Sequence, residues 1–251
     1  MRVVVCVKQV KQLGDEVEFT DDGLDVDPDY LDTALNEWDA CATEEALLLR
    51  ERLGGEVVLV TVGDTGAEAA LRRCLAMGAD RAVRVEGVAE RDPLDVGRAL
   101  AEVVRAESPD LVLCGVQSSD SVQGATGTAL AEYAGMPRVA VVTKVDYDEG
   151  ARRAVVRREL EGGLVDVVEV DTPAVLTVQT GINQPRYANL RAIKQAEAIE
   201  IETRQAPEGG FATSRVRRMF VPPKGAGAEL LNGSPTEIAA RIAEIVKEKL
   251  Q

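Results

Sequence analysis

The chain has 251 residues, with 29 Lys and Arg against 43 Asp and Glu, a formal net charge of −14 and no histidine. The lack of histidine excludes a Ser-His-Asp triad, a Cys-His pair and the common His-ligated zinc and haem sites. The negative charge argues against electrostatic binding of nucleic acid, because neutralising phosphates needs a basic face. The length fits one large domain or two small ones.

The cysteines and the apolar runs indicate the compartment. Cys6, Cys41, Cys74 and Cys114 form no CxxC pair, so we expect buried thiols in a reducing compartment and no metal site. The N-terminal segment lacks the features of a signal peptide, and no run of 18 apolar residues predicts a membrane span. We therefore expect a cytoplasmic protein that does not insert into a membrane.

The first half of the chain alternates short apolar runs with amphipathic segments. The runs predict five strands, at Val3–Val7, Glu56–Val62, Arg81–Val85, Leu111–Cys114 and Val139–Thr143. An acidic hairpin or loop over 15–32 follows the first strand. Helices are predicted over 35–53, 65–77 and 94–106 and between Gly127 and Gly135, the second opened by a capping box of Thr65 and Glu68. This alternation predicts a doubly wound, mostly parallel five-stranded core sheet of α/β class.

The pattern changes after residue 143. Antiparallel strands are expected over about 144–171, at Lys144–Tyr147, Ala154–Leu160 and Leu164–Val170, with a hairpin turn at 161–163. Ala174–Thr180 is predicted to return to the core, which completes an α/β domain over 1–183. An extended arm rich in Pro and Gly follows over 184–233.

The last segment, 234–251, is predicted to be an amphipathic helix. Ser234 and Glu237 form a capping box, and one apolar stripe is made by Ile238, Ile242, Ile245, Val246 and Leu250. The helix either packs back on its own sheet or docks on a partner subunit. The length of the arm favours the partner.

A ligand of such a sheet binds past the carboxyl ends of its strands, where the strand order reverses. In the commonest order, the first and fourth strands flank that point, and Cys6 and Val7 are placed to flank an adenine ring. The loop after the fourth strand, 115–127, is rich in Gly and Ser and leads into a helix N-terminus, which favours a phosphate. This loop matches neither the GxGxxG motif nor the P-loop. Two interpretations therefore remain: the loop binds a mononucleotide mostly through backbone groups, or it only caps and packs its helix.

Several ordered blocks over roughly residues 1–200 resemble the small (beta) subunit of electron transfer flavoproteins. The blocks are VKQV at 7–10, NEWD at 36–39, LAMGADRA at 75–82, DLVLCG at 110–115, EGGL at 161–164 and NQPRYANL at 183–190. The resemblance implies an adenine-nucleotide α-hydrolase-like fold and a heterodimer with a large (alpha) subunit. It also implies one redox FAD shared with that subunit, and AMP in a pocket of the small subunit. The heterodimer would carry electrons from flavoprotein dehydrogenases of acyl-CoA type to a quinone oxidoreductase, with the chemistry belonging to the flavin.

The resemblance also assigns residues to sites. The nucleotide pocket would be lined by Cys6, Val7, Lys8, Asn36, Glu37, Trp38, Asp39, Val62, Gln117, Ser118, Ser119, Asp120, Ser121, Val122, Gln123, Gly124, Ala125, Thr126, Gly127 and Thr128. Trp38 and Tyr187 are candidates for the FAD interface, although Trp38 also suits core packing of its helix. Leu190 occupies the place of the family's anchor for partner dehydrogenases, or is the first apolar residue of a short helix.

Departures from the family pattern leave alternatives open. Ala125 stands where the family usually has Gln. The pocket could therefore hold a second FAD in place of AMP, as it does in flavin-bifurcating members of the family that use NADH. Lys194 stands alone where the family has paired lysines, which leaves partner recognition open. A second hypothesis assigns the chain to a different functional class, the stand-alone adenine-nucleotide sensors of the universal-stress type. Such a sensor would not need residues 184–251.

Overall fold

The computed structural model describes residues 1–14, 16–87, 92–208, 215–223, 225 and 227–250. Residue 15 of the acidic segment, residues 209–214, 224 and 226 of the predicted arm, and residue 251 of the predicted terminal helix lie outside this description. Among the described helices, none is long and apolar enough to cross a membrane.

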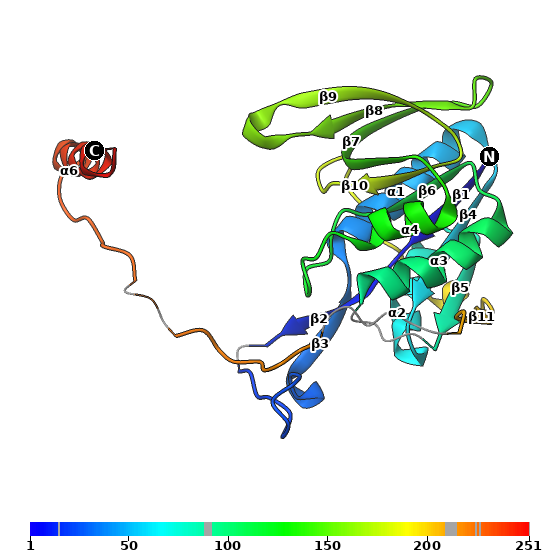
Figure 1. Cartoon of the computed structure of the whole chain (residues 1–251), viewed down its shortest axis with the longest axis horizontal. Coiled ribbons are helices and arrows are strands. Elements are labelled where there is room, and N and C mark those ends of the chain that lie inside the picture. The colour runs from blue at the N-terminus through cyan, green and yellow to red at the C-terminus, as the bar shows by residue number, and fades with distance from the viewer. Residues whose placement is uncertain (15, 88–91, 209–214, 224, 226, 251) are drawn as a thin grey trace.

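One large sheet organises the molecule (Figure 1). Its strand order is β11-β5-β4-β1-β6-β10-β7-β8-β9. The strands are β1 (Arg2–Cys6), β4 (Glu56–Val62), β5 (Arg81–Glu86), β6 (Leu111–Gly115), β7 (Arg138–Asp148), β8 (Arg153–Glu159), β9 (Val165–Asp171), β10 (Ala174–Val178) and β11 (Glu202–Gln205). The pairs from β11 to β7 are parallel, and the β7–β8 and β8–β9 pairs are antiparallel. This confirms the predicted α/β class with an antiparallel addition.

Helices cover both faces of the parallel part. α1 (Glu37–Leu53) and α2 (Glu68–Met77) share one apolar cluster with alternate residues of the strands, and α5 (Leu190–Glu197) packs at its border. α3 (Pro93–Glu107) and α4 (Thr126–Ala134) form a second cluster with the other strand faces. Because β1 and its neighbours are apolar on both faces, the sheet is buried between the two layers, as parallel sheets require.

The sheet is wider than the five-stranded core predicted from the sequence. β10 inserts between β6 and β7, so the fourth and fifth predicted strands are not neighbours. β11 adds a parallel edge strand beside β5, although its sequence, ETRQ, carries no apolar pattern. Edge strands need little apolar surface, since one side of the ladder and part of each face contact water. The predicted strands at 139–143 and 144–147 are a single strand, β7.

The acidic segment lies in a small separate hairpin. β2 (Gln9–Leu13) and β3 (Leu31–Leu35) pair antiparallel, and the described residues between them, 14 and 16–30, include a 3₁₀ turn at Pro28–Tyr30. The predicted turn at Glu161–Gly163 is also a 3₁₀ segment, which joins β8 to β9.

The predicted capping box of Thr65 and Glu68 is wrong. A 3₁₀ turn, Thr65–Ala67, precedes α2, and the Asp64 carboxylate caps it by accepting a hydrogen bond from the Gly66 N–H. The Glu68 carboxylate instead accepts a hydrogen bond from Arg84 of β5 at 3.0 Å. A side chain in the capping pattern is free to bond elsewhere when a stronger, charged partner is in reach.

The C-terminal helix α6 (Pro235–Lys249) lies away from the α/β body, at the end of an extended arm (Figure 1). Ser234 and Glu237 form the predicted capping box. No described residue of α6 is buried, and Ile242 and Val246 of the apolar stripe are each half exposed. The stripe therefore has no partner within the described part of this chain.

Candidate functional site

The carboxyl ends of β1 and β6 form the candidate site. The two strands are parallel neighbours, and their last paired residues are Cys6 and Cys114. After β1 the chain reaches α1 on one face of the sheet, whereas after β6 it reaches α4 on the other face. This divergence is the point at which doubly wound sheets bind ligands, and the sequence predicted it for these two strands.

The first turn of α1 lies between the loop that follows β1 and the loop that follows β6, and it contacts both. Asp39 is 5% exposed, and its two oxygens accept hydrogen bonds from the Lys8 N–H and the Gly115 N–H, each at 2.8 Å. Asn36, which is 1% exposed, donates its Nδ2 to the Gln117 carbonyl at 2.8 Å. These contacts join three segments that are far apart in the sequence.

The buried groups at this point have shifted acidities. Burial raises the pKa of Asp39 to about 6, although hydrogen bonds from Gly115, Asn36 and Lys8 act in the opposite direction. Burial also raises the pKa of the Cys114 thiol to about 12, and it raises the pKa of Cys6 well above its ordinary value. Both thiols are therefore neutral near pH 7 and suit the packing of an apolar ring better than nucleophilic chemistry.

An ion pair joins the two loops. Lys8 Nζ lies 2.7 Å from Asp120 Oδ1 and 3.2 Å from Ser118 Oγ. Burial opposes ionisation of Asp120, but the hydrogen bonds from Lys8 and Ser118 outweigh it and lower the pKa of this carboxyl. The positive charge of Lys8 is thus largely neutralised within the chain. A phosphate at this site would depend mainly on backbone N–H groups.

The N-terminus of α4 offers such groups. Its N-cap, Ala125, makes no side-chain capping bond to the helix, so the dipole end is not closed by a carboxylate or hydroxyl. Gly127 in the first turn is buried, and a Cβ there would lie 2.7 Å from Cys114 Sγ and from Thr177 Cγ2. The helix end therefore sits directly on the ends of β6 and β10. Small residues and a free dipole end fit a backbone-held phosphate.

The structure brings most of the predicted pocket residues to this crevice. Cys6 and Val7 are buried at the end of β1, and residues 117–128 run from β6 into α4. Val62 ends β4, beside β1, and packs against the cluster that contains Cys6. Glu37 is exposed. Their role in holding a nucleotide stays a prediction.

Two glutamines that the sequence analysis assigned no role lie nearby. Trp38 is half-buried, and its indole N–H donates to Gln179 Oε1 at 2.8 Å, just after β10. Gln9 follows Lys8, and its Oε1 is buried with no hydrogen-bond partner in the described part of the chain. A buried acceptor without a donor is costly, so it marks a place where a ligand or partner group would fit.

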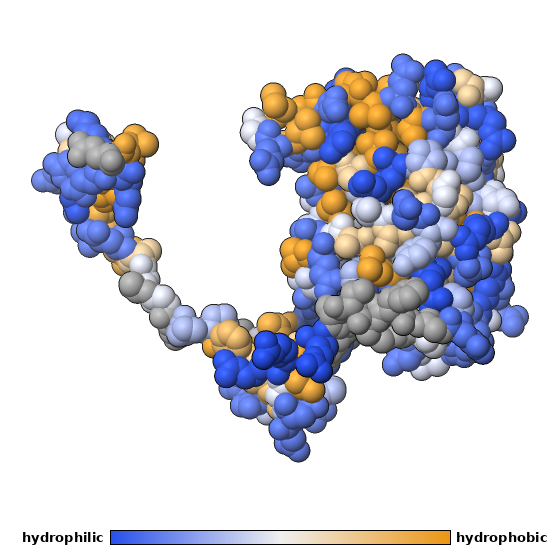
Figure 2. Space-filling model, viewed as in Figure 1, coloured by the Kyte–Doolittle hydropathy of each residue, from blue (hydrophilic) through white to orange (hydrophobic). Residues whose placement is uncertain are grey.

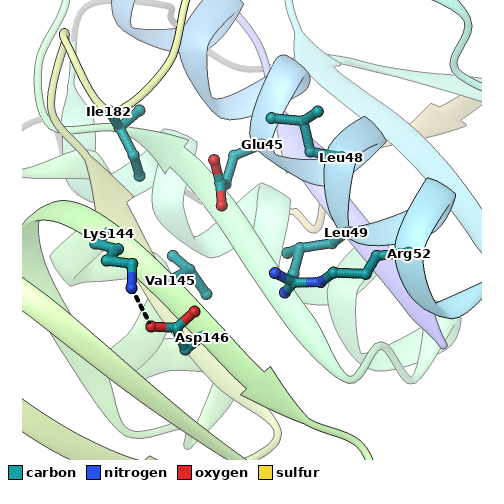
Figure 3. A pocket seen from close by; sticks show the side chains of 8 residues that line it. All are labelled: Glu45, Leu48, Leu49, Arg52, Lys144, Val145, Asp146 and Ile182. Carbon is teal, nitrogen blue, oxygen red and sulfur yellow. Dashed lines mark ion pairs between the residues drawn. The ribbon is translucent and has the colours of Figure 1, made fainter.

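A cavity of about 330 Å³ lies elsewhere, between α1 and β7 (Figure 3). Its polar wall includes Glu45 and Arg52 of α1 and the ion pair of Lys144 with Asp146 on β7. None of the predicted nucleotide-binding residues lines it. The cavity therefore does not belong to the crevice at β1 and β6.

A second predicted site, around Tyr187 and Leu190, lies at the start of α5. Tyr187 is 92% and Leu190 80% exposed, and Leu190 is the first residue of the helix. The segment is nevertheless firmly attached, because Arg186 makes an ion pair with the buried Glu44 of α1. At the other end of α5, Arg72 Nη1 donates to the Ala196 carbonyl at 2.7 Å. An exposed apolar residue on an anchored helix has the form of a docking contact.

The antiparallel strands expose a further apolar surface, visible over β8 and β9 in Figure 2. Val165 and Val167 of β9 are each more than half exposed, and Leu164 before them is 65% exposed. Exposed apolar patches on one face of a sheet indicate contact with another chain.

Comparisons with known proteins agree with this architecture. A family model described as the electron transfer flavoprotein domain matches residues 24–208. The chain is 46% identical to the electron transfer flavoprotein subunit beta of Methylophilus methylotrophus, over 99% of this chain and 98% of that protein. It is 33% identical to the subunit beta of Syntrophomonas wolfei, over 100% and 98% of the two chains. It is 34% identical to the mitochondrial subunit beta of Arabidopsis thaliana, over 80% of each chain. The chain belongs to the electron transfer flavoprotein subunit beta family.

Proposed function

We propose that this chain is the small subunit of a heterodimeric electron transfer flavoprotein and that its crevice at β1 and β6 holds AMP. The observation that carries the proposal is the junction of Lys8, Asn36, Asp39 and the 117–128 loop beside the uncapped N-terminus of α4. A backbone-held mononucleotide fits this junction. The small residues allow close approach, the helix dipole favours a phosphate, and neutral thiols border the apolar side.

The redox chemistry belongs to an FAD shared with the large subunit, which supplies one- and two-electron transfer when bound. This chain's own contribution is to position that flavin and to dock partners. Trp38 and Tyr187 are the proposed aromatic contacts near the flavin. Leu190 is the proposed anchor for flavoprotein dehydrogenases of acyl-CoA type, which deliver electrons that pass on to a quinone oxidoreductase.

The large subunit is the proposed occupant of the unpartnered apolar surfaces. The stripe of α6 and the part of the arm that follows β11 would wrap onto it, since a helix with an exposed apolar face is poorly stable by itself. A stand-alone nucleotide sensor would have no use for this segment. The four free, buried cysteines support a reducing compartment such as the cytoplasm.

Co-expression with a large (alpha) subunit of the family tests the proposal. The complex is purified, its absorption spectrum recorded, and its nucleotides are released by acid and identified. One flavin and one AMP per heterodimer are expected. Two flavins without AMP, together with NADH-dependent reduction, would assign the pocket to a second FAD and the protein to flavin bifurcation. A colourless chain that stays monomeric beside the large subunit would overturn the proposal.

A further inference from the structure

The strands β1 and β6 stop pairing at the mouth of the candidate crevice. Their ladder ends at Cys6 and Cys114, and the next N–H groups on the two strands are those of Val7 and Gly115. The Val7 N–H donates to the Val60 carbonyl of β4. The N–H groups of Lys8 and Gly115 are left at the divergence, where a donor shielded from water and without an acceptor would destabilise the fold.

One carboxylate satisfies both donors. Asp39 Oδ2 accepts from Lys8 and Asp39 Oδ1 accepts from Gly115, each at 2.8 Å. The Asp39 carboxylate thus takes the place of the next pair of inter-strand hydrogen bonds and holds the Lys8 and Gly115 N–H groups at a fixed separation. A bond to a charged acceptor is also stronger than the backbone bond that it replaces.

The contact between Asp39 and Gly115 is closely packed. Gly115 has no side chain, and a Cβ built on it would lie 2.5 Å from Asp39 Oδ1 and 2.5 Å from Trp38 Cβ. The Asp39 carboxylate is therefore enclosed by the β6 loop on one side and the β1 loop on the other. Thr43 Oγ1 donates to the Asp39 carbonyl at 2.8 Å and steadies the helix turn beneath it.

We infer that Asp39 is a positioning residue that sets the separation of the loops after β1 and β6, the proposed nucleotide-binding loops, by holding them together. Each oxygen of Asp39 accepts a hydrogen bond from one of the chain's own N–H groups, and these two bonds join the loops. In the proposed function, Lys8 and the 117–128 loop contact the ligand, and Asp39 acts through them. The inference rests on the proposed function for the presence of a nucleotide at this site and for its identity.

The test compares AMP binding by two carboxylate-to-amide variants of the full chain, each co-expressed with the large subunit. In Asp39→Asn, the amide keeps one acceptor but turns an NH₂ group toward the second backbone N–H. In Glu45→Gln, another buried carboxylate of α1 is neutralised, outside the crevice and bonded to Asn183. Calorimetry with AMP after nucleotide removal is expected to show affinity at least tenfold weaker for Asp39→Asn and within twofold of the parent for Glu45→Gln.

A second readout separates positioning from general loss of stability. Hydrogen exchange in the nucleotide-free protein is expected to accelerate at the Lys8 and Gly115 amides in Asp39→Asn, with the core amides of β1 and β6 unchanged. If Asp39→Asn does not fold, Gly115→Ala forces the same loops apart while the Asp39 carboxylate is retained, and it should weaken AMP binding as strongly.

Asp39→Asn with AMP affinity within twofold of the parent would overturn the inference, as would equal losses in Asp39→Asn and Glu45→Gln. Unchanged exchange at both amides would overturn it as well. A parent protein that binds no AMP would instead contradict the proposed function. The exchange comparison would still decide the role of Asp39.

Discussion

Arg186 and Glu44 form a bidentate ion pair that attaches the docking segment to the α/β body. Arg186 Nη2 lies 2.8 Å from Glu44 Oε1, Arg186 Nε lies 2.8 Å from Glu44 Oε2, and the Glu44 side chain is 6% exposed. The Arg186 backbone N–H also donates to Glu44 Oε2 at 3.0 Å. The ion pair therefore fixes both the side chain and the backbone immediately before Tyr187.

Removing the Arg186 guanidinium is expected to destabilise the protein. Arg186→Gln leaves a buried carboxylate without its cation, so the free energy of unfolding should fall by about 2 kcal/mol, less than for a fully buried pair because Arg186 is one-third exposed. Urea unfolding measures the change. The double variant Glu44→Gln with Arg186→Gln should recover part of the loss. A single variant as stable as the parent would contradict the assigned role.

Gly127 is expected to tolerate no side chain. Gly127→Ala places a methyl group 2.7 Å from Cys114 Sγ and Thr177 Cγ2, and overpacking of this kind costs about 1–3 kcal/mol. The displacement of α4 should also weaken AMP binding, as measured by calorimetry. Gly14→Ala is the matched control, because its new Cβ meets only ordinary contacts at 3.8 Å. Equal stability of the two variants would show that α4 can shift freely.

Asp39 is expected to make stability depend on pH in the direction opposite to that of a salt-bridged carboxylate. Burial raises its pKa from 3.8 to about 6, so between these values the folded state binds more protons than the unfolded state. Stability from this group is present below pH 4 and is lost as the pH rises through 6, by on the order of 3 kcal/mol.

The comparison variant for that pH dependence is Asp39→Asn, which has no proton to lose. Unfolding free energies of parent and variant are measured from pH 4 to pH 7. The difference between them should shift in favour of the variant as the pH rises. A difference that stays constant across this range would mean that Asp39 ionises at its ordinary pKa in the folded state.

Deleting α6 is expected to leave the α/β body intact. None of its described residues is buried. The free energy of unfolding of a chain ending at residue 233 should therefore lie within about 0.5 kcal/mol of that of the full chain. Leu130→Ala, in the buried part of α4, calibrates the assay with an expected loss of about 2–5 kcal/mol. The shortened chain should fail to form a stable heterodimer in gel filtration. A large drop in its own unfolding midpoint would show that α6 packs on the body.

The elements with strong periodicity were predictable from the sequence. The strand at Glu56–Val62 matches the structure at both ends, and the end of α1 at Leu53 follows from Gly54, which adopts a positive φ of 76°. The helix at Pro235 was also predictable, since its capping box is local. The short helix α5 was expected only as one of two readings of Leu190, and β11 was not predicted, because a helix of eight residues and a polar edge strand carry little apolar periodicity.

Local sequence patterns were sufficient to predict the buried strands, the helices between them, the family and the loops after β1 and β6. These features depend on residues close together in the chain or on ordered blocks of residues. The tertiary structure alone decided that β10 lies between β6 and β7 and that Asp39 joins Lys8 to Gly115, which are 31 and 76 residues away from it. Such contacts depend on the order of the strands in the sheet and on how α1 packs against it. The local pattern of residues in a single sequence encodes neither of these.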